Sequence, residues 1–260
     1  MYICQIMHKK LILITNDDGI TAPGILALSK IAKRFGEVCV VAPDKPQSGM
    51  GHAITINSTL RLHKTKHHGV ETEFACSGTP VDCVKIAIHK TLKRKPDIVL
   101  SGINHGSNLS INVIYSGTMS AAVEGAIEGV PSIGFSLCDY SIEADFTQGE
   151  KFIQEIIEKM LTKNHEEDIC LNVNIPKLRA DEIQGIQVCR AAKSNWVEEF
   201  DERKDPYGHP YYWLTGNLQN FEKQSTDTDL YYNEKGFVTV VPVGFDLTQH
   251  KQIPNLLKVF

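Results

Sequence analysis

Residues 11–19 read LILITNDDG, an apolar run that stops at two adjacent carboxylates and a glycine. A short apolar run bounded in this way is typical of a buried strand. Side chains on a continuing strand alternate between its faces, so Asp17 and Asp18 could not share a ligand there. If the strand ends at Asn16 and Gly19 turns the chain, both carboxylates converge at its carboxyl end. Two carboxylates about 4 Å apart repel each other by about 4 kcal/mol at an effective dielectric constant near 20, and a divalent cation removes this repulsion. The pair is therefore either a divalent-cation site or a cap for the next helix.

The overall composition is that of an ordinary globular protein. The chain has 260 residues, of which 42% are hydrophobic and 22% charged, and this length allows one large α/β domain. A net charge of -4 argues against a general nucleic-acid-binding surface. No apolar run reaches the roughly 18 residues of a membrane span, and the first residues lack the pattern of a signal peptide. We expect a cytoplasmic protein with neither a nucleic-acid polymer nor a membrane as stable partner, in which residues 1–6 need not belong to the native start.

The cysteines give no sign of a disulfide framework or of a zinc site. The chain has seven, an odd number, scattered through apolar segments, and none forms a Cys-x-x-Cys pair. We therefore expect buried, reduced thiols.

The first strand opens a strand–helix–strand unit. Helical spacing of apolar residues from Ile25 to Phe35 predicts a helix that begins near Pro23 and ends at Gly36. Residues 37–43 form the next buried strand, so the sheet is parallel. Further strands are predicted at 97–101, 132–137, 168–175 and 237–243, a hairpin-like pair at 58–63 and 70–76, and helices at 81–92, from 115–118 onward and at 152–161.

The chain changes character beyond about Arg190. Residues 191–233 are polar, aromatic and loop-like, and exposed aromatics of this kind favour an oligomer interface or a lid over a site. We expect a single domain over residues 1–260, with its core at about 9–190 and an arm plus a C-terminal strand at about 191–260. The segment Trp196–Trp213 is predicted to order on association.

Polar loops follow several predicted strands where each strand ends. Ligands of open α/β sheets bind outside these carboxyl ends. Beyond the Asp17–Asp18 pair, the polar residues in such positions are Ser48, Thr79 and Asn104. Carboxylate, hydroxyl and amide oxygens suit Mg²⁺ or Mn²⁺ better than zinc, which prefers nitrogen and sulfur.

The segment Tyr115–Thr118 opens a helix with hydroxyl and backbone N–H groups. Such a start either binds an anion or is a plain Ser/Thr N-cap. Together with the glycine-containing loops and the oxygen ligands, it indicates a phosphate ester as substrate. The reaction would be hydrolysis, with a metal that orients the phosphoryl oxygens and activates a water.

Five short motifs, in the same order, resemble the SurE family of stationary-phase survival proteins, which are metal-dependent 5'-nucleotidases. The resemblance runs from about Leu11 to Phe135 and is carried by Thr15–Gly19, Val41–Asp44 with Gln47–Gly49, Ser77–Cys83, Ser101–Asn108 and Tyr115–Thr118. It implies a Rossmann-like three-layer α/β sandwich with a mostly parallel sheet and a C-terminal β-rich arm exchanged between subunits of a homodimer, sometimes paired into tetramers. It also implies hydrolysis of nucleoside 5'-monophosphates, often 3'-monophosphates, and sometimes short polyphosphate.

The resemblance also implies roles for individual residues. One divalent cation per subunit, Mg²⁺ or Mn²⁺, would be held by Asp17, Asp18, Ser48 and Asn104, with the two aspartates as the catalytic residues. The implied phosphate-binding residues are Asn16, Gly49, Asn108, Ser116, Gly117 and Thr118.

Alternatives remain open at two levels. A carboxylate could attack phosphorus directly, although the adjacent acids favour a metal-bound water oriented by Asp17. His52 and His105 are candidates for the general acid, or they are surface donors. The other function classes are a nucleotide- or sugar-transferring enzyme, which would release no phosphate without an acceptor, and a nucleotide sensor, which would leave the ligand intact.

Overall fold

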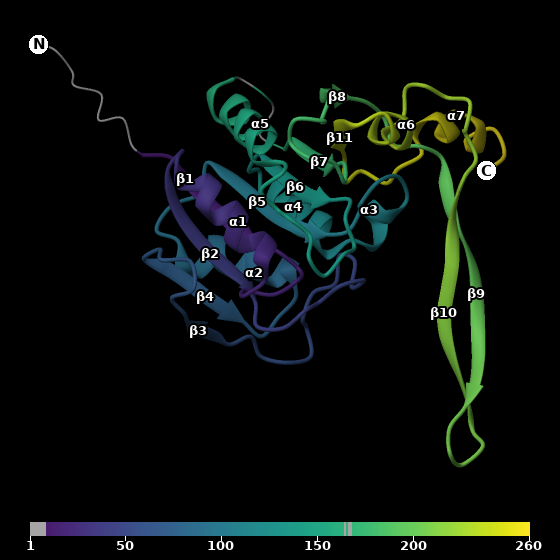
Figure 1. The fold of residues 1–260 in the computed structure, drawn as a ribbon, viewed down its shortest axis with the longest axis horizontal. Helices are drawn as coiled ribbons and strands as arrows, with labels where there is room; N and C mark the ends of the chain where they lie inside the picture. Colours follow the sequence, from purple (N-terminus) through teal and green to yellow (C-terminus); the bar gives the residue numbers. More distant parts are fainter. Residues whose placement is uncertain (1–8, 164, 166–167) are drawn as a thin grey trace, which may run out of the picture.

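A mixed sheet of nine strands forms the centre of the computed structural model, which describes residues 9–163, 165 and 168–260 (Figure 1). The expectation for residues 1–6 lies outside the described residues. The strand order is β3-β4-β2-β1-β5-β6-β7-β11-β8. These strands are β1 (Leu11–Thr15), β2 (Glu37–Pro43), β3 (Leu62–Lys64), β4 (Thr72–Cys76), β5 (Ile98–His105), β6 (Ser132–Leu137), β7 (Cys170–Ile175), β8 (Gly185–Val188) and β11 (Phe237–Val243). From β4 to β7 every neighbouring pair is parallel.

Helices cover both faces of the sheet and make three layers. Alternate residues of β1 point to opposite sides, so Ile12 and Ile14 enter the core beneath α1 (Pro23–Ala32) and α5 (Glu150–Thr162). Leu13 enters a second core beneath α2 (Pro80–Ile86) and α4 (Gly117–Ile127). The remaining helical elements are η1 (Ala87–Thr91), α3 (Asn112–Tyr115), α6 (Asp229–Glu234), η2 (His250–Gln252) and α7 (Ile253–Leu256). The three-layer α/β prediction is confirmed.

The chain reverses its direction across the sheet at β1. From β1 it passes to β2 on one side, and it later returns to β5 on the other side. The carboxyl ends of β1 and β5 therefore flank a switch point, where doubly wound sheets leave a crevice for a ligand.

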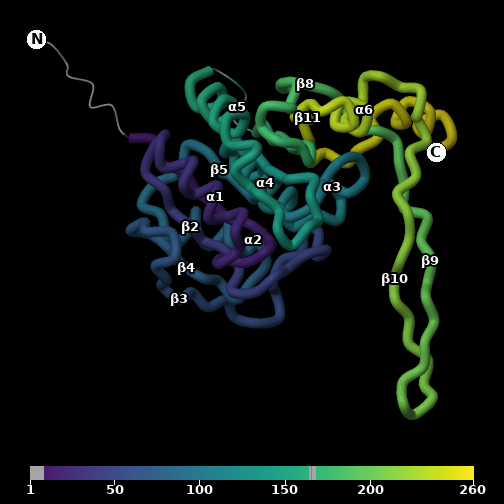
Figure 2. Tube along the Cα trace, viewed as in Figure 1, coloured from purple at the N-terminus to yellow at the C-terminus, as the bar shows by residue number. Residues whose placement is uncertain are grey.

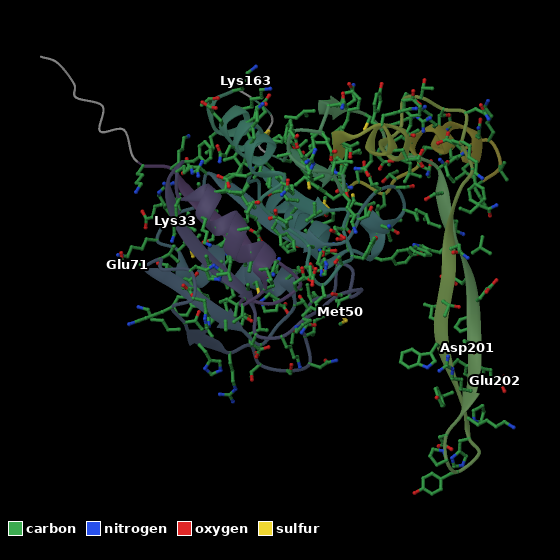
Figure 3. The ribbon with its side chains drawn as sticks, viewed as in Figure 1. Lys33, Met50, Glu71, Lys163, Asp201 and Glu202 are labelled. Carbon is green, nitrogen blue, oxygen red and sulfur yellow. The ribbon has the colours of Figure 1, made fainter. Side chains whose placement is uncertain are left out.

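The arm is a long antiparallel hairpin of β9 (Ser194–Lys204) and β10 (Pro210–Asn220). Figures 1 and 2 show it extending away from the sheet, and Asp201 and Glu202 lie on its distant part (Figure 3). The expectation of a loop-like segment was wrong for these residues. Neither face of the hairpin packs on the core, so the sequence lacks the apolar alternation by which a half-buried strand is found.

Two strands differ from the expectation, one in its place and one in its length. β11 lies in the main sheet between β7 and β8, so the sheet includes residues that we expected beyond the core boundary. β5 continues to His105, where a loop was expected after Ser101, and its pairing with β6 shifts register between Ser101 and Asn104. Gly102 permits this shift, because it has a φ of +125° and an added Cβ would lie 2.3 Å from the carbonyl oxygen of Phe135.

The other local predictions hold with smaller changes. The helix expected at 81–92 is α2 followed by the π-helical turn η1, and the hairpin-like pair is reduced to β3 and β4. Six cysteines in the described part of the chain are free, and Cys39, Cys76, Cys83 and Cys170 are buried. No helix formed by the described residues is long and apolar enough to cross a membrane.

Candidate active site

A cavity of about 340 Å³ lies at the carboxyl ends of β1 and β5. Six predicted site residues line it: Asp17, Ser48, Gly49, Asn104, Asn108 and Ser116. They come from segments far apart in the sequence: the loops after β1, β2 and β5, the last residues of β5 itself, and the start of α4. The structure thus brings together most of the residues that the motifs indicated.

Asp17 is the most buried acid of the cavity, with 3% of its surface exposed. The hydroxyl of Thr118, in the first turn of α4, donates a hydrogen bond to its carboxylate. Burial raises the pKa of Asp17 to about 6, with the charge of Asp18 adding to the shift and the hydrogen bond from Thr118 opposing it. A carboxylate held in this way is stabilised by a nearby cation.

Gly117 allows the close approach of Asp17 to the start of α4. A Cβ added at Gly117 would lie 2.7 Å from the Cβ of Asp17 and 2.9 Å from its Oδ2. The residue does not line the cavity. The absence of a side chain at Gly117 leaves room for the carboxylate of Asp17.

Asp18 and Asn104 meet at the same edge. The backbone N–H of His105 donates to Oδ2 of Asp18 at 3.2 Å, and burial raises the pKa of Asp18 against this hydrogen bond. The amide nitrogen of Asn104 donates to the carbonyl of Gly106 at 2.8 Å, which orients the side chain and leaves its own carbonyl oxygen for another partner.

The donor set fits one hard divalent cation. In the described part of the chain, neither Asp17 nor Asp18 takes part in an ion pair, and no three or more His, Cys, Asp or Glu side chains gather as a metal cluster. The site therefore offers two uncompensated carboxylates with a hydroxyl and an amide oxygen, which is the chemistry of a Mg²⁺ or Mn²⁺ site that keeps several waters.

Buried amides hold the loop that carries Asn108. Its amide nitrogen donates to the hydroxyl of Ser136 at 2.8 Å, and its backbone N–H donates to Oδ1 of Asn174 at 2.8 Å. Asn172 donates to the carbonyl of Asn108 at 2.8 Å. Sequence reasoning read Asn172 and Asn174 only as part of a buried strand, although two amides at a spacing of two residues mark one polar face of it.

A buried carboxylate connects this loop to the base of the arm. Asp229 is fully buried and accepts hydrogen bonds from the backbone N–H of Ser110 at 2.7 Å and of Ala192 at 2.9 Å. The hydroxyl of Ser110 donates to the carbonyl of Ala192 at 2.6 Å. The loop of Asn108 and the start of β9 therefore share one anchor.

Ser116 is the N-cap of α4, since its hydroxyl accepts a hydrogen bond from the backbone N–H of Met119 at 3.1 Å. It also lines the cavity. An N-cap hydroxyl still carries a proton to donate, and the free N–H groups of a first helical turn attract an anion. Both readings of this segment, cap and anion site, are compatible with the geometry.

Besides Asp18 and Gly117, three predicted residues do not line the cavity. Asn16 is fully buried, and its side chain donates to the carbonyl of Gly19 at 3.0 Å. Thr118 is buried against Asp17. Thr79 forms the capping box of α2 and donates to the carbonyl of Ala53 at 2.7 Å. These side chains shape the loops around the cavity without lining it.

The two candidate histidines have different surroundings. His52 lies 2.8 Å from the buried carboxylate of Glu124, which Lys85 also contacts at 2.5 Å. Burial by itself raises the pKa of Glu124, but the hydrogen bonds from His52 and Lys85 outweigh this effect and hold the pKa below its usual range. His52 is not among the residues that line the cavity, whereas His105 is, with its Nε2 donating to the carbonyl of Ser141 at 2.6 Å.

Aromatic residues complete the wall of the cavity, and sequence reasoning did not assign them to it. They are Tyr115, Tyr140 and Trp196. Trp196 comes from β9, and its indole N–H donates to Oδ1 of Asn112 at 2.8 Å. The signal available in the sequence was the aromatic character of the arm, which indicated a lid or an interface without naming the residue that reaches the site.

Known proteins match this chain over almost its whole length. A family model described as Survival protein SurE matches residues 12–198. The "5'-nucleotidase SurE" of Christiangramia forsetii is 58% identical and that of Flavobacterium psychrophilum 55% identical, each covering 96% of this chain and 97% of the relative. The crystal structure of the SurE protein from Aquifex aeolicus superposes with a TM-score of 0.83 at 39% identity, covering 96% of this chain and 99% of that one. The chain therefore belongs to the SurE family.

Proposed function

We propose that the protein is a divalent-metal-dependent phosphomonoesterase that hydrolyses nucleoside 5'-monophosphates to nucleoside and phosphate. One observation carries the proposal: the cavity at the sheet's switch point contains a buried carboxylate, Asp17, beside Asp18, and neither is ion-paired among the described residues. The relatives named 5'-nucleotidase SurE support the reaction class. Nucleoside 3'-monophosphates and short polyphosphate are proposed as further substrates.

Asp17, Asp18, Ser48 and Asn104 would hold one Mg²⁺ or Mn²⁺ per subunit. When bound, such a cation supplies positive charge for the phosphoryl oxygens and lowers the pKa of a water. The raised pKa of Asp17 supports this assignment, because burial without a cationic partner disfavours its charged form.

The chain's own residues bind and orient the phosphate. Asn108 and the N-capped start of α4 at Ser116 lie in the wall of the same cavity and offer hydrogen-bond donors to phosphoryl oxygens. Asp17 orients the attacking water. Of the two candidate general acids, His105 lines the cavity, so we assign protonation of the leaving alkoxide to His105.

The proposal is tested by phosphate release from a panel of nucleoside 5'- and 3'-monophosphates and tripolyphosphate, with Mg²⁺, Mn²⁺ or chelator. Metal-dependent release from the 5'-monophosphates is the expected result. Release only when an alcohol acceptor is supplied would indicate a transferase. Tight binding of a monophosphate that stays intact would indicate a sensor.

Metal affinity is expected to fall as the pH is lowered through about 6, the pKa of Asp17 in the metal-free protein. The protonated acid does not bind a cation, so affinity should drop about tenfold per pH unit below that value. Calorimetric titration with Mn²⁺ between about pH 7.5 and about pH 5 measures this. An affinity that stays constant across this range would contradict the assignment of Asp17 as a ligand.

We also propose that the arm joins two subunits into a homodimer, which can pair into a tetramer. Its exposed apolar side chains support this proposal, since a monomer would leave them in water. They include Phe200, Tyr211, Tyr212 and Trp213, each between 41% and 65% exposed.

Removing residues 199–215 is expected to give a monomer by light scattering. The deletion shortens the hairpin but leaves Trp196 and its pairing partner Leu218, and it spares β11, which belongs to the main sheet. Truncation from residue 191 would remove β11 as well and could unfold the protein. A shortened chain that remains dimeric would refute the role of the arm.

A further inference from the structure

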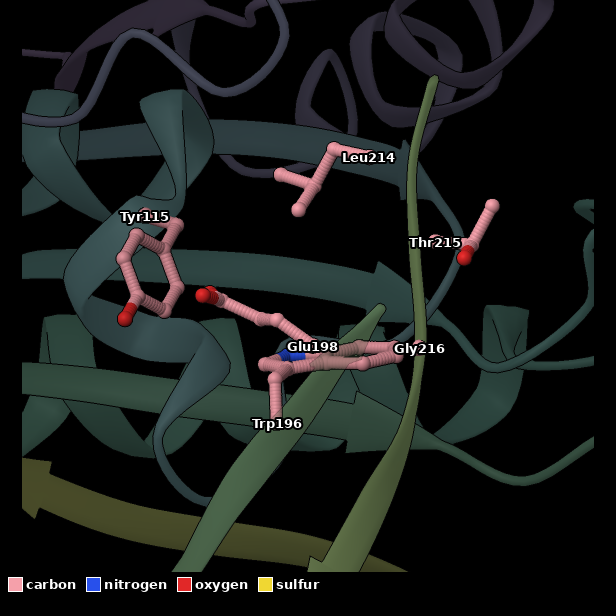
Figure 4. A pocket seen from close by; sticks show the side chains of 6 residues that line it. All are labelled: Tyr115, Trp196, Glu198, Leu214, Thr215 and Gly216. Atoms are coloured by element: carbon pink, nitrogen blue, oxygen red, sulfur yellow. The ribbon is translucent and has the colours of Figure 1, made fainter. Parts of the chain in front are cut away.

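A second cavity, of about 420 Å³, lies beside the candidate active site (Figure 4). It is lined by Tyr115, Trp196, Glu198, Leu214, Thr215 and Gly216. Tyr115 and Trp196 line both cavities, so the two spaces share a wall. A ligand with its phosphate near Asp17 could extend into this second space.

The walls of the second cavity suit a flat, apolar group. Tyr115 is 48% exposed and Leu214 is 64% exposed, so apolar surface stands open to the cavity. The ring of Trp196 has a fixed orientation, because its indole N–H donates to Oδ1 of Asn112 at 2.8 Å. Aromatic faces of this kind stack with nucleobases, which contributes about 1–3 kcal/mol per base.

Glu198 places a carboxylate in the wall of the second cavity. Figure 4 shows its side chain extending from β9 towards Tyr115, beside the ring of Trp196. No hydrogen bond or ion pair within the described residues occupies its carboxylate. An ionised carboxylate only accepts hydrogen bonds, and it repels a phosphate. This space therefore favours the part of the ligand that donates hydrogen bonds and carries no negative charge.

We propose that the second cavity is a nucleobase subsite that selects bases with hydrogen-bond donors on the Watson–Crick edge. The inference rests on the proposed function, which places the phosphate of the same molecule in the first cavity. Guanine fits best, because its N1–H and N2–H donors lie side by side and match the two oxygens of one carboxylate. Hypoxanthine has the same ring system but lacks the 2-amino donor, and uracil flanks its single donor with two carbonyl oxygens.

The test uses the binding of nucleosides, which does not depend on hydrolysis. The chain has two tryptophans, Trp196 and Trp213, so the full-length Trp213→Phe protein reports on Trp196 alone. Guanosine is expected to quench the fluorescence of Trp196 saturably. Inosine should bind about tenfold more weakly, because it lacks one hydrogen bond to the carboxylate of Glu198. Glu198→Gln in the same background should weaken guanosine about tenfold and remove the difference between guanosine and inosine.

Glu199→Gln is the matched control, since neighbouring residues of a strand point to opposite faces, and it should leave both affinities unchanged. Equal binding of guanosine and inosine, or a preference that survives Glu198→Gln, would overturn the subsite. Fluorescence that changes with protein concentration but not with guanosine would also overturn it and would indicate a second chain in this space. Failure of the proposed function has a separate outcome, in which guanosine binds selectively but the unsubstituted protein releases no phosphate from guanosine 5'-monophosphate.

Discussion

Replacing Asp17 with asparagine should lower metal-dependent phosphate release by about 10³-fold, the scale expected for loss of a principal electrostatic group. Asparagine keeps the size of the side chain and can still accept the hydrogen bond from Thr118. The variant loses the buried negative charge that would hold the cation and orient the water. Steady-state phosphate release at saturating Mn²⁺ measures the effect.

The same substitution should stabilise the metal-free protein. Burial raises the pKa of Asp17 from its usual 3.8 to about 6, so the charge of this group costs free energy in the folded protein at neutral pH. Removing that charge should raise the free energy of unfolding by roughly 3 kcal/mol near neutral pH. Urea denaturation in chelator measures this. A variant that is less stable, or that keeps its activity, would contradict the role assigned to Asp17.

Gly117→Ala should reduce kcat by about 10²-fold, the scale of a displacement of about 1 Å within an active site. The new Cβ would lie 2.7 Å from the Cβ of Asp17, so the carboxylate or the start of α4 must move. The helix itself should persist, because alanine favours helix over glycine by about 1 kcal/mol. We expect the variant to bind Mn²⁺ more weakly, while its thermal unfolding temperature stays unchanged.

Gly244→Ala provides the matched control, since an added Cβ there meets nothing within 4 Å. It should leave both kcat and Mn²⁺ affinity unchanged. If Gly117→Ala behaves like Gly244→Ala, the close approach between α4 and Asp17 has no functional consequence.

Segments whose structure depends on local burial were predictable from the sequence. β6 and β11 have the predicted bounds, because continuous apolar runs define strands buried on both faces. The polar residues predicted after β1, β2 and β5, which are parallel, then indicated where Asp17, Ser48 and Asn104 would meet. The alignment of carboxyl ends is a property of the sheet, so it needed no knowledge of side-chain contacts.

Features that depend on contacts between distant segments were not predictable. The hairpin of β9 and β10 is paired only with itself, and its sequence carries no core-facing pattern. The hydrogen bonds of Asn174 with Asn108 and of Trp196 with Asn112 join residues far apart in the chain. His52 and His105 both lie in loops that were predicted to follow strands, and only the structure shows that Glu124 engages the first of them.

The anchor at Asp229 joins the arm to the loop beside the candidate active site. The buried carboxylate of Asp229 accepts hydrogen bonds from the backbone N–H groups of both Ser110 and Ala192. The loop that carries Asn108 and the start of the hairpin are therefore held by the same side chain. The hairpin is fixed in this way to the core next to the loop of Asn108. If the proposed dimer forms through the hairpin, a movement of its tip would be transmitted to this loop. Dilution that separates the proposed dimer would therefore lower the rate of phosphate release per subunit as well.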